Sequence, residues 1–160
     1  MATATVAKNS VALSAARKKE IAADLNTSLA HLIDLALRAK EAHWNVTGPN
    51  FHGLHETFDA IASDVRDYAD DIAERARALG HLAHGTLSNV TKKSTLGDFP
   101  ADSADWKTLV QLVHDGLVTT SQVIQAFAAE TEDDIATQDV YIEVIRGLDK
   151  WAWMLASHLS

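Results

Sequence analysis

The sequence predicts an all-α protein, a four-helix bundle in which one long connection joins the second helix to the third. Three observations predict this fold. Apolar residues recur at three- and four-residue spacing through four segments, and no segment alternates like a half-buried strand. Glycine and proline are absent from residues 1–47 and 54–79 but gather in one stretch between Gly80 and Pro100. A chain of 160 residues with 47% apolar residues suits one domain.

The first two helices are expected over about residues 17–46 and 51–79, with a flexible basic tail over residues 1–16 and the bundle domain over 17–160. The first apolar stripe contains Ile21, Leu25, Leu29, Leu32, Leu35 and Ala39. The second contains Leu54, Phe58, Ile61, Val65, Ile72 and Leu79. Because only a short turn at Gly48-Pro49 separates the two helices, they must be antiparallel neighbours.

The connection over residues 80–102 is long enough to cross the length of the bundle, which is the ferritin-like arrangement. A short fifth helix could form there, around Leu87 to Val90. The third helix is expected to begin at an N-cap in Asp102-Ser103 and carries Leu109, Leu112, Val113, Leu117, Ile124 and Phe127. The fourth follows the polar residues 131–134 and carries Ile135, Ile142, Ile145, Leu148, Ala152, Leu155 and Leu159.

Composition narrows the chemistry. The absence of cysteine excludes disulfides, thiolate metal sites and cysteine nucleophiles, whereas eight histidines and 22 acidic residues leave many other metal ligands. No apolar run is long enough to span a membrane, and the first charges follow apolar residues instead of preceding them as in a secretory signal. We therefore expect a cytoplasmic protein without membrane contact.

The net charge of −8 is unevenly distributed. Residues 1–19 contain no acid and four positive charges, on Lys8, Arg17, Lys18 and Lys19, so residues 20–160 carry −12. An acidic body repels nucleic acid, so any DNA contact is expected to involve this N-terminal region. A positive chain end is often only solvated, and that alternative stays open.

The second helix carries two pairs of potential metal ligands on one face. His55 and Asp59 form the first pair, and Asp70 and Glu74 form the second. All four side chains project within about 100° of one another. The midpoints of the two pairs are about 22 Å apart along the axis, since an α-helix rises about 1.5 Å per residue. No single metal ion can contact both pairs of one chain.

Two-fold symmetry would resolve this separation. A second copy of the helix, packed antiparallel across an axis near Asp64 and Val65, would bring the first pair of one chain opposite the second pair of the other, twice over. His43 could join the His55 side, which gives two imidazoles and three carboxylates, a ligand set suited to Fe(II). A solvated acidic face with interface histidines is the alternative. Carboxylates on a dimer interface would repel one another without a cation, which favours metal.

The residues around the first turn resemble the Dps family (DNA-binding protein from starved cells). The similar residues are His43-Trp44-Asn45-Val46, Gly48, Asn50-Phe51, His55-Glu56, Asp59, Asp70-x-x-x-Glu74-Arg75 and Leu148-Asp149-Lys150-x-x-Trp153. The resemblance covers residues 20–160, and it implies a ferritin-like dodecamer of two-fold dimers around a hollow core. It places ferroxidase sites at the two-fold interfaces, in agreement with the geometry above.

Carried onto this chain, the resemblance implies that His43, His55 and Asp59 come from one subunit and Asp70 and Glu74 from its mate. The tighter iron would lie on Asp70, Glu74 and His43, and the looser one on His55 and Asp59. Trp44 would relay electrons, with packing as the alternative. The implied reaction is oxidation of two Fe(II) ions by one hydrogen peroxide, followed by storage of ferric mineral that protects DNA.

Other candidates are weaker. Asp134, Asp139 and Glu143 could line an iron-entry pore at a three-fold axis, or belong to a solvated helix face. His52, His81 and His84 have helical ligand spacing but no assigned role. The alternative function is a nucleoid-associated protein that compacts DNA, with the shell as a multivalent scaffold. A classical ferritin is excluded, because the chain has no Glu-x-x-His motif. The sequence does not decide between peroxide and dioxygen.

Overall fold

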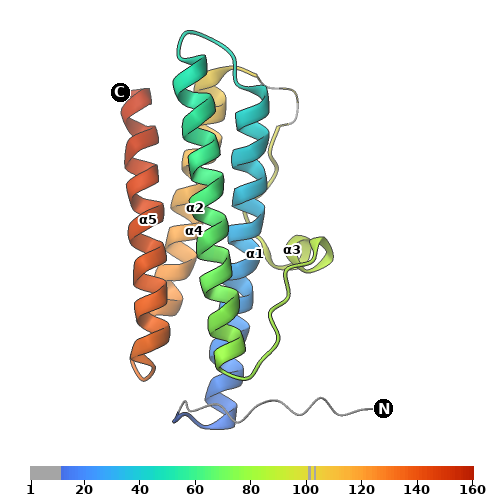
Figure 1. The fold of residues 1–160 in the computed structure, drawn as a ribbon, viewed down its shortest axis with the longest axis vertical. Helices are drawn as coiled ribbons and strands as arrows, with labels where there is room; N and C mark the ends of the chain where they lie inside the picture. The colour runs from blue at the N-terminus through green and yellow to red at the C-terminus, as the bar shows by residue number, and fades with distance from the viewer. Residues whose placement is uncertain (1–11, 101, 103) are drawn as a thin grey trace.

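The computed structural model describes residues 12–100, 102 and 104–160, and within them it confirms the all-α prediction. Four long helices run side by side and a short one lies outside them (Figure 1). The helices are α1 (Ala15–Asn45), α2 (Phe51–Ala78), α3 (Leu87–Lys93), α4 (Trp106–Ala129) and α5 (Ile135–Leu159). The predicted tail lies mostly outside the described residues, Lys8 included. Ser14 caps α1 by accepting a hydrogen bond from the Arg17 amide at 3.2 Å.

The predicted apolar stripes form the core in α1, α2 and most of α4. Every predicted stripe residue of α1 and α2 is at most 5% exposed. The stripe of α5 was partly wrong, because Ile135, Ile142 and Leu159 are exposed by 77%, 44% and 37%. The prediction was right for Leu148, Ala152 and Leu155, which form the buried face together with Thr137, Tyr141 and Val144. The exposed residues leave apolar side chains on the outside of α5.

The long connection between α2 and α4 runs along α1, and it contains the fifth helix as α3 (Figure 1). Polar side chains of α1 form hydrogen bonds that hold this connection against the bundle. Buried His31 contacts Thr95 through Nε2, and Arg38 donates to the carbonyl oxygens of Leu96 and Gly97. The predicted N-cap of α4 was wrong. Asp105 caps this helix by accepting from the Thr108 amide at 3.0 Å.

The turn between α1 and α2 is fixed against the start of α4. The Thr47 amide and hydroxyl both donate to the Ala104 carbonyl oxygen, at 3.0 and 2.9 Å. Gly48 has a φ of +119°, in the region that favours glycine, and an added Cβ would lie 2.7 Å from Cδ1 of Trp106. The indole therefore packs directly on the glycine. This contact sets the relative position of the two helix ends that carry His43 and His55.

No helix among the described residues is both long and apolar enough to cross a membrane.

Candidate metal centre

His43 at the end of α1 and His55 in the second turn of α2 form a reciprocal pair. Their rings stack with centroids 3.7 Å apart and planes inclined by 21°. Nδ1 of His43 lies 2.7 Å from the carbonyl oxygen of His55, and Nδ1 of His55 lies 2.8 Å from the carbonyl oxygen of His43. Phe51 covers the second ring, with its centroid 5.3 Å away.

These contacts fix the tautomer of both imidazoles. A carbonyl oxygen only accepts hydrogen bonds, so Nδ1 of each ring must carry the proton and donate it. In the neutral rings, Nε2 therefore has a free lone pair on the side away from the backbone. A metal-bound histidine ordinarily donates its other nitrogen in this way, which orients the ring and raises its basicity. The pair is therefore preorganised for metal binding.

Asp59 lies one turn beyond His55 and is paired with Lys40, which sequence reasoning missed. The Lys40 ammonium donates to Oδ1 of Asp59 at 2.6 Å. This hydrogen bond is the main reason why the pKa of Asp59 is lowered; desolvation opposes it, and the charges of Lys40, His43 and His55 lower the pKa further. Lys40 lies one turn before His43 and Trp44 on α1, which is the only sequence signal that could have found it.

The first ligand group opens onto a depression of about 580 Å³ lined by His43, Phe51, His52, His55, Glu56, Asp59, Ala60 and Ser63. Asp70 and Glu74 lie farther along α2 and are exposed. Glu74 lines a separate depression, of about 370 Å³, with Arg75 and Glu143. Within the described part of the chain, no three His or acidic side chains gather closely enough to hold a metal ion. A single chain thus presents two half-sets of candidate ligands. The first half-set is His43, His55 and Asp59, and the second is Asp70 and Glu74.

Arg75, next to Glu74, joins the end of α2 to the start of α5. Its Nη2 donates to both oxygens of Asp134, at 2.9 Å each, and its Nε donates to Thr137 at 2.7 Å. The Asp134 side chain is 6% exposed. Burial would raise its pKa, but hydrogen bonds from Thr137 and Arg75 outweigh burial and lower the pKa. Asp134 is therefore a buried anchor with its carboxylate engaged, unlike the solvent-facing group that pore lining requires.

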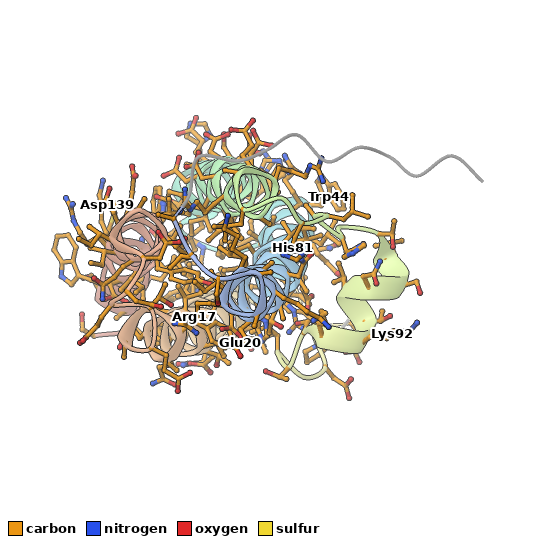
Figure 2. All side chains as sticks on the ribbon, turned by 90° about the horizontal axis from the view of Figure 1, so that it is seen from below. Arg17, Glu20, Trp44, His81, Lys92 and Asp139 are labelled. Carbon is orange, nitrogen blue, oxygen red and sulfur yellow. The ribbon has the colours of Figure 1, made fainter. Side chains whose placement is uncertain are left out.

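The other two pore candidates are exposed on α5. Asp139 projects from the side of the bundle opposite α3 (Figure 2). Glu143 borders the depression that contains Glu74. Their role at a pore stays a prediction.

Comparison with known proteins identifies the family. The model of the ferritin-like domain family matches residues 22–160. The DNA protection during starvation protein of Agrobacterium fabrum is 33% identical, over 89% of this chain and 90% of the relative. Its namesake from Mycolicibacterium smegmatis is 32% identical, over 92% of this chain and 81% of the relative. The chain belongs to the Dps family of ferritin-like proteins.

Solved Dps structures share the fold over nearly the whole chain. The tetragonal form of Mycobacterium smegmatis Dps superposes with a TM-score of 0.91 at 30% identity, covering 96% of this chain and 95% of the other. Dps from Microbacterium arborescens in its high iron form gives 0.83 at 34% identity, covering 92% and 99%. The resemblance to Dps proteins read from the sequence is confirmed.

The basic N-terminal region of this Dps-family chain is partly neutralised. Arg17 makes a two-pronged ion pair with Asp133, at 2.9 Å on each prong, contacts Glu20 at 3.3 Å and donates to the Glu130 carbonyl oxygen. The hydrogen bond from Arg17 is the main reason why the pKa of Asp133 is lowered. Arg17 is thus held at the lower end of the bundle, whereas Lys18 and Lys19 make no ion pair with a described carboxylate.

Trp44 is 68% exposed, so it is not part of the core of a single chain. The Lys40 ammonium lies 5.9 Å from its ring centroid. Figure 2 shows the indole on the same side of the bundle as α3. The exposed ring beside His43 is available to a partner subunit or to a redox step, and both predicted roles for it stay open.

Proposed function

We propose that this Dps-family protein oxidises Fe(II) with hydrogen peroxide at centres shared between two subunits and stores the Fe(III) inside a hollow shell. The observation that carries the proposal is the reciprocal His43–His55 pair, in which Nδ1 of each ring is used by the backbone and both residues line one open depression. Imidazole with carboxylate suits Fe(II). A structural relative from Vibrio cholerae is described as a ferritin-like diiron-carboxylate protein, which supports iron as the substrate.

Each centre would combine both half-sets of ligands. In an antiparallel α2 dimer, His43, His55 and Asp59 of one subunit would face Asp70 and Glu74 of its mate, and the geometry repeats by symmetry. The exposed carboxylates of the second half-set have no cationic partner within ion-pair distance among the described residues. Bound Fe(II) would supply a positive charge beside these carboxylates at each of the two symmetry-related centres. The iron itself would therefore help to hold the dimer together.

The reaction balances with two Fe(II) ions and one peroxide. Each Fe(II) gives up one electron, and the O–O bond accepts both and is cleaved. Two protons complete two water molecules. Holding two ions at one centre delivers both electrons together, so a hydroxyl radical is not released between single-electron steps. The Fe(III) products would then hydrolyse and deposit as ferric oxyhydroxide.

The shell is proposed to be a dodecamer. Ile135, Ile142 and Trp153 are exposed and project within about 20° of one another on α5, at 100° per residue, and such a row of apolar side chains in water supports burial between subunits. Asp139 and Glu143 are the proposed acidic lining of the iron-entry pore. The electrostatic attraction of Fe(II) to such a lining would raise the rate of entry.

Kinetics of Fe(II) oxidation after peroxide addition test the proposed centre. His43→Ala and Asp70→Ala should each slow the initial rate by about 100-fold, as loss of a ligand weakens metal binding by a large factor. His84→Ala, which lies outside the depression that His43 lines, is the matched control and should react at the parental rate. Equal rates in all three variants would indicate chemistry on the mineral surface and refute a defined centre.

DNA binding is the second candidate function, supported by the names of the relatives and by the unpaired charges of Lys18 and Lys19. A gel shift in rising salt tests it. If residues 1–19 carry the contact, deletion of residues 1–14 together with Lys18→Gln/Lys19→Gln should abolish a shift that salt already weakens. Binding that survives this variant would locate the contact elsewhere.

A further inference from the structure

A second depression lies between the start of α1, the α2–α3 linker and α3, far from the His43–His55 pair along the bundle. Its volume is about 260 Å³, and its lining residues are Lys19, Ala22, Ala23, Asn26, His81, Leu82, His84 and Lys93. Two lysines and two histidines therefore surround it, and no acidic residue lines it. We call it the basic pocket. In Figure 2, His81 lies on the α3 side of the bundle, opposite Asp139.

The walls of the basic pocket are held in place. Buried Asn26 donates from Nδ2 to the carbonyl oxygens of Ala22 and Leu82, at 2.8 and 2.9 Å, and its Oδ1 accepts from the His84 amide at 2.8 Å. The Asn26 side chain thus connects the linker to α1 through both its NH2 group and its carbonyl oxygen. The histidines consequently sit on a fixed backbone, even though they belong to a non-helical segment.

The positive charge of the basic pocket is poorly compensated. Neither Lys19 nor Lys93 forms an ion pair with any carboxylate in the described ranges, and Lys93 Nζ contacts only the neutral hydroxyl of Thr27, at 3.3 Å. Asp24 is the acidic group that feels the charge of Lys93. Burial and the nearby Glu130 raise its pKa, whereas the charges of Arg17 and Lys93 lower it, and Asp24 does not line the basic pocket. The basic pocket is thus a locally positive site on a protein with a net charge of −8, and such a site attracts anions.

We propose that the basic pocket binds a phosphate group. The two ammonium groups supply charged donors and the two imidazoles supply N–H donors, from three elements in all, which suits a tetrahedral oxyanion with oxygens on every side. The volume holds such an ion with several waters, since one water occupies about 30 Å³. A divalent metal is disfavoured at the His81–His84 pair because two ammonium groups flank it. The phosphate can be free inorganic phosphate or a phosphodiester of DNA, and the second source would deepen the proposed DNA binding.

Phosphate binding to the iron-free, assembled protein tests the proposal by equilibrium dialysis with labelled inorganic phosphate. Lys19→Gln/Lys93→Gln should weaken binding by about tenfold or more, and His81→Gln/His84→Gln should weaken it as well. The matched control is Lys107→Gln/Lys150→Gln, which removes the same charge from α4 and α5 and should bind like the parent. Equal affinity in the two lysine variants would overturn the proposal.

A DNA arm identifies the source. Affinity for a short duplex is measured against salt concentration, and loss of the one backbone phosphate held in the pocket should reduce the slope by about 0.9. A reduced slope in Lys19→Gln/Lys93→Gln but not in the control assigns the pocket to the DNA backbone, whereas an unchanged slope with weakened phosphate binding assigns it to free phosphate. Both lysine variants should oxidise Fe(II) with peroxide at the parental rate. Failure of the phosphate proposal is therefore distinguishable from failure of the iron proposal.

Discussion

At the scale of single residues, the Lys40–Asp59 ion pair competes with metal for one ligand. The ammonium lies 2.6 Å from Oδ1, and the Lys40 side chain as a whole is only 17% exposed, so neighbouring atoms restrict its movement. An iron ion that binds Asp59 must displace this hydrogen bond or share the carboxylate. The iron position on His55 and Asp59 should therefore bind iron more weakly than the position on His43 with Asp70 and Glu74 of the mate.

Lys40→Gln removes the competitor and is expected to tighten binding of the second metal ion by about tenfold, because the carboxylate no longer has a charged partner. Anaerobic titration with Co(II), a visible-absorbing substitute for Fe(II), measures both binding steps. Lys150→Gln, whose side chain lies over Trp151 on α5, is the control. An unchanged second step in Lys40→Gln would mean that the ion pair opens at negligible free-energy cost.

At the scale of elements, the α1–α2 turn and the start of α4 form one unit that positions the histidine pair. Gly48→Ala should be strongly destabilising, because the new Cβ would need to occupy space 2.7 Å from Trp106 with φ at +119°. We expect a loss of about 2 kcal/mol in unfolding free energy and a slower Fe(II) oxidation rate. Denaturant unfolding and stopped-flow kinetics measure the two effects.

Gly53→Ala is the matched control for this substitution. Gly53 lies in the first turn of α2 and has nothing within 4 Å of an added Cβ, so alanine should be neutral or stabilise by up to about 1 kcal/mol. If both variants behave alike, the contact between Gly48 and Trp106 does not constrain the turn.

The anchor between α2 and α5 predicts a pH dependence. The pKa of Asp134 is lower in the folded protein than its ordinary value of 3.8, so the ion pair contributes stability above pH 3.8 and loses it as pH falls through the lowered value. Asp134→Asn should cost about 3 kcal/mol near pH 7, since it leaves Arg75 without its charge partner. The difference from the parent should shrink below pH 4 in denaturant titrations. Asp133→Asn, which removes an exposed pair, should have the smaller effect.

The sequence predicted the elements that depend on local pattern and missed those that depend on packing. Periodicity located four helices, with α1 and α2 within two residues of their bounds. It overextended the apolar face of α5, because a stripe of isoleucines does not reveal whether it packs inside the chain or against another subunit. The α4 cap was also missed, since Asp102 and Asp105 are equally good capping residues and only the bridge from Thr47 to the start of α4 distinguishes them.

The candidate site also has features that follow from local sequence pattern and features that follow from packing. Its candidate ligands could be selected from the sequence, because helical spacing relates His55 to Asp59 and Asp70 to Glu74 without knowledge of the fold. The partners of those residues could not. Lys40 reaches Asp59 from another helix, and the reciprocal bonds of His43 and His55 require the exact angle at which α1 and α2 meet. Sequence spacing gives no access to such angles.

At the scale of the whole molecule, the proposed function requires ligands from two chains, and complementation tests this requirement. His55→Ala/Asp59→Ala and Asp70→Ala/Glu74→Ala should each abolish rapid peroxide-driven Fe(II) oxidation. In a mixed dimer, one centre combines both lesions, and the other takes an intact half-set from each chain. Activity should therefore return toward one working centre per mixed dimer, about half of the parental amplitude.

Stopped-flow oxidation measures the recovered amplitude after co-expression, and native mass spectrometry establishes that subunits have mixed. The control mixes His55→Ala/Asp59→Ala with Asp59→Ala, since both variants damage the same half-set and no centre in their mixed dimer can be complete. If activity recovers in the first mixture and not in the control, the working centre must take ligands from two chains, because the two ligand pairs of one α2 helix lie about 22 Å apart. Mixed shells as inactive as their parents would refute the shared centre and leave the exposed carboxylates of α2 as a solvated face.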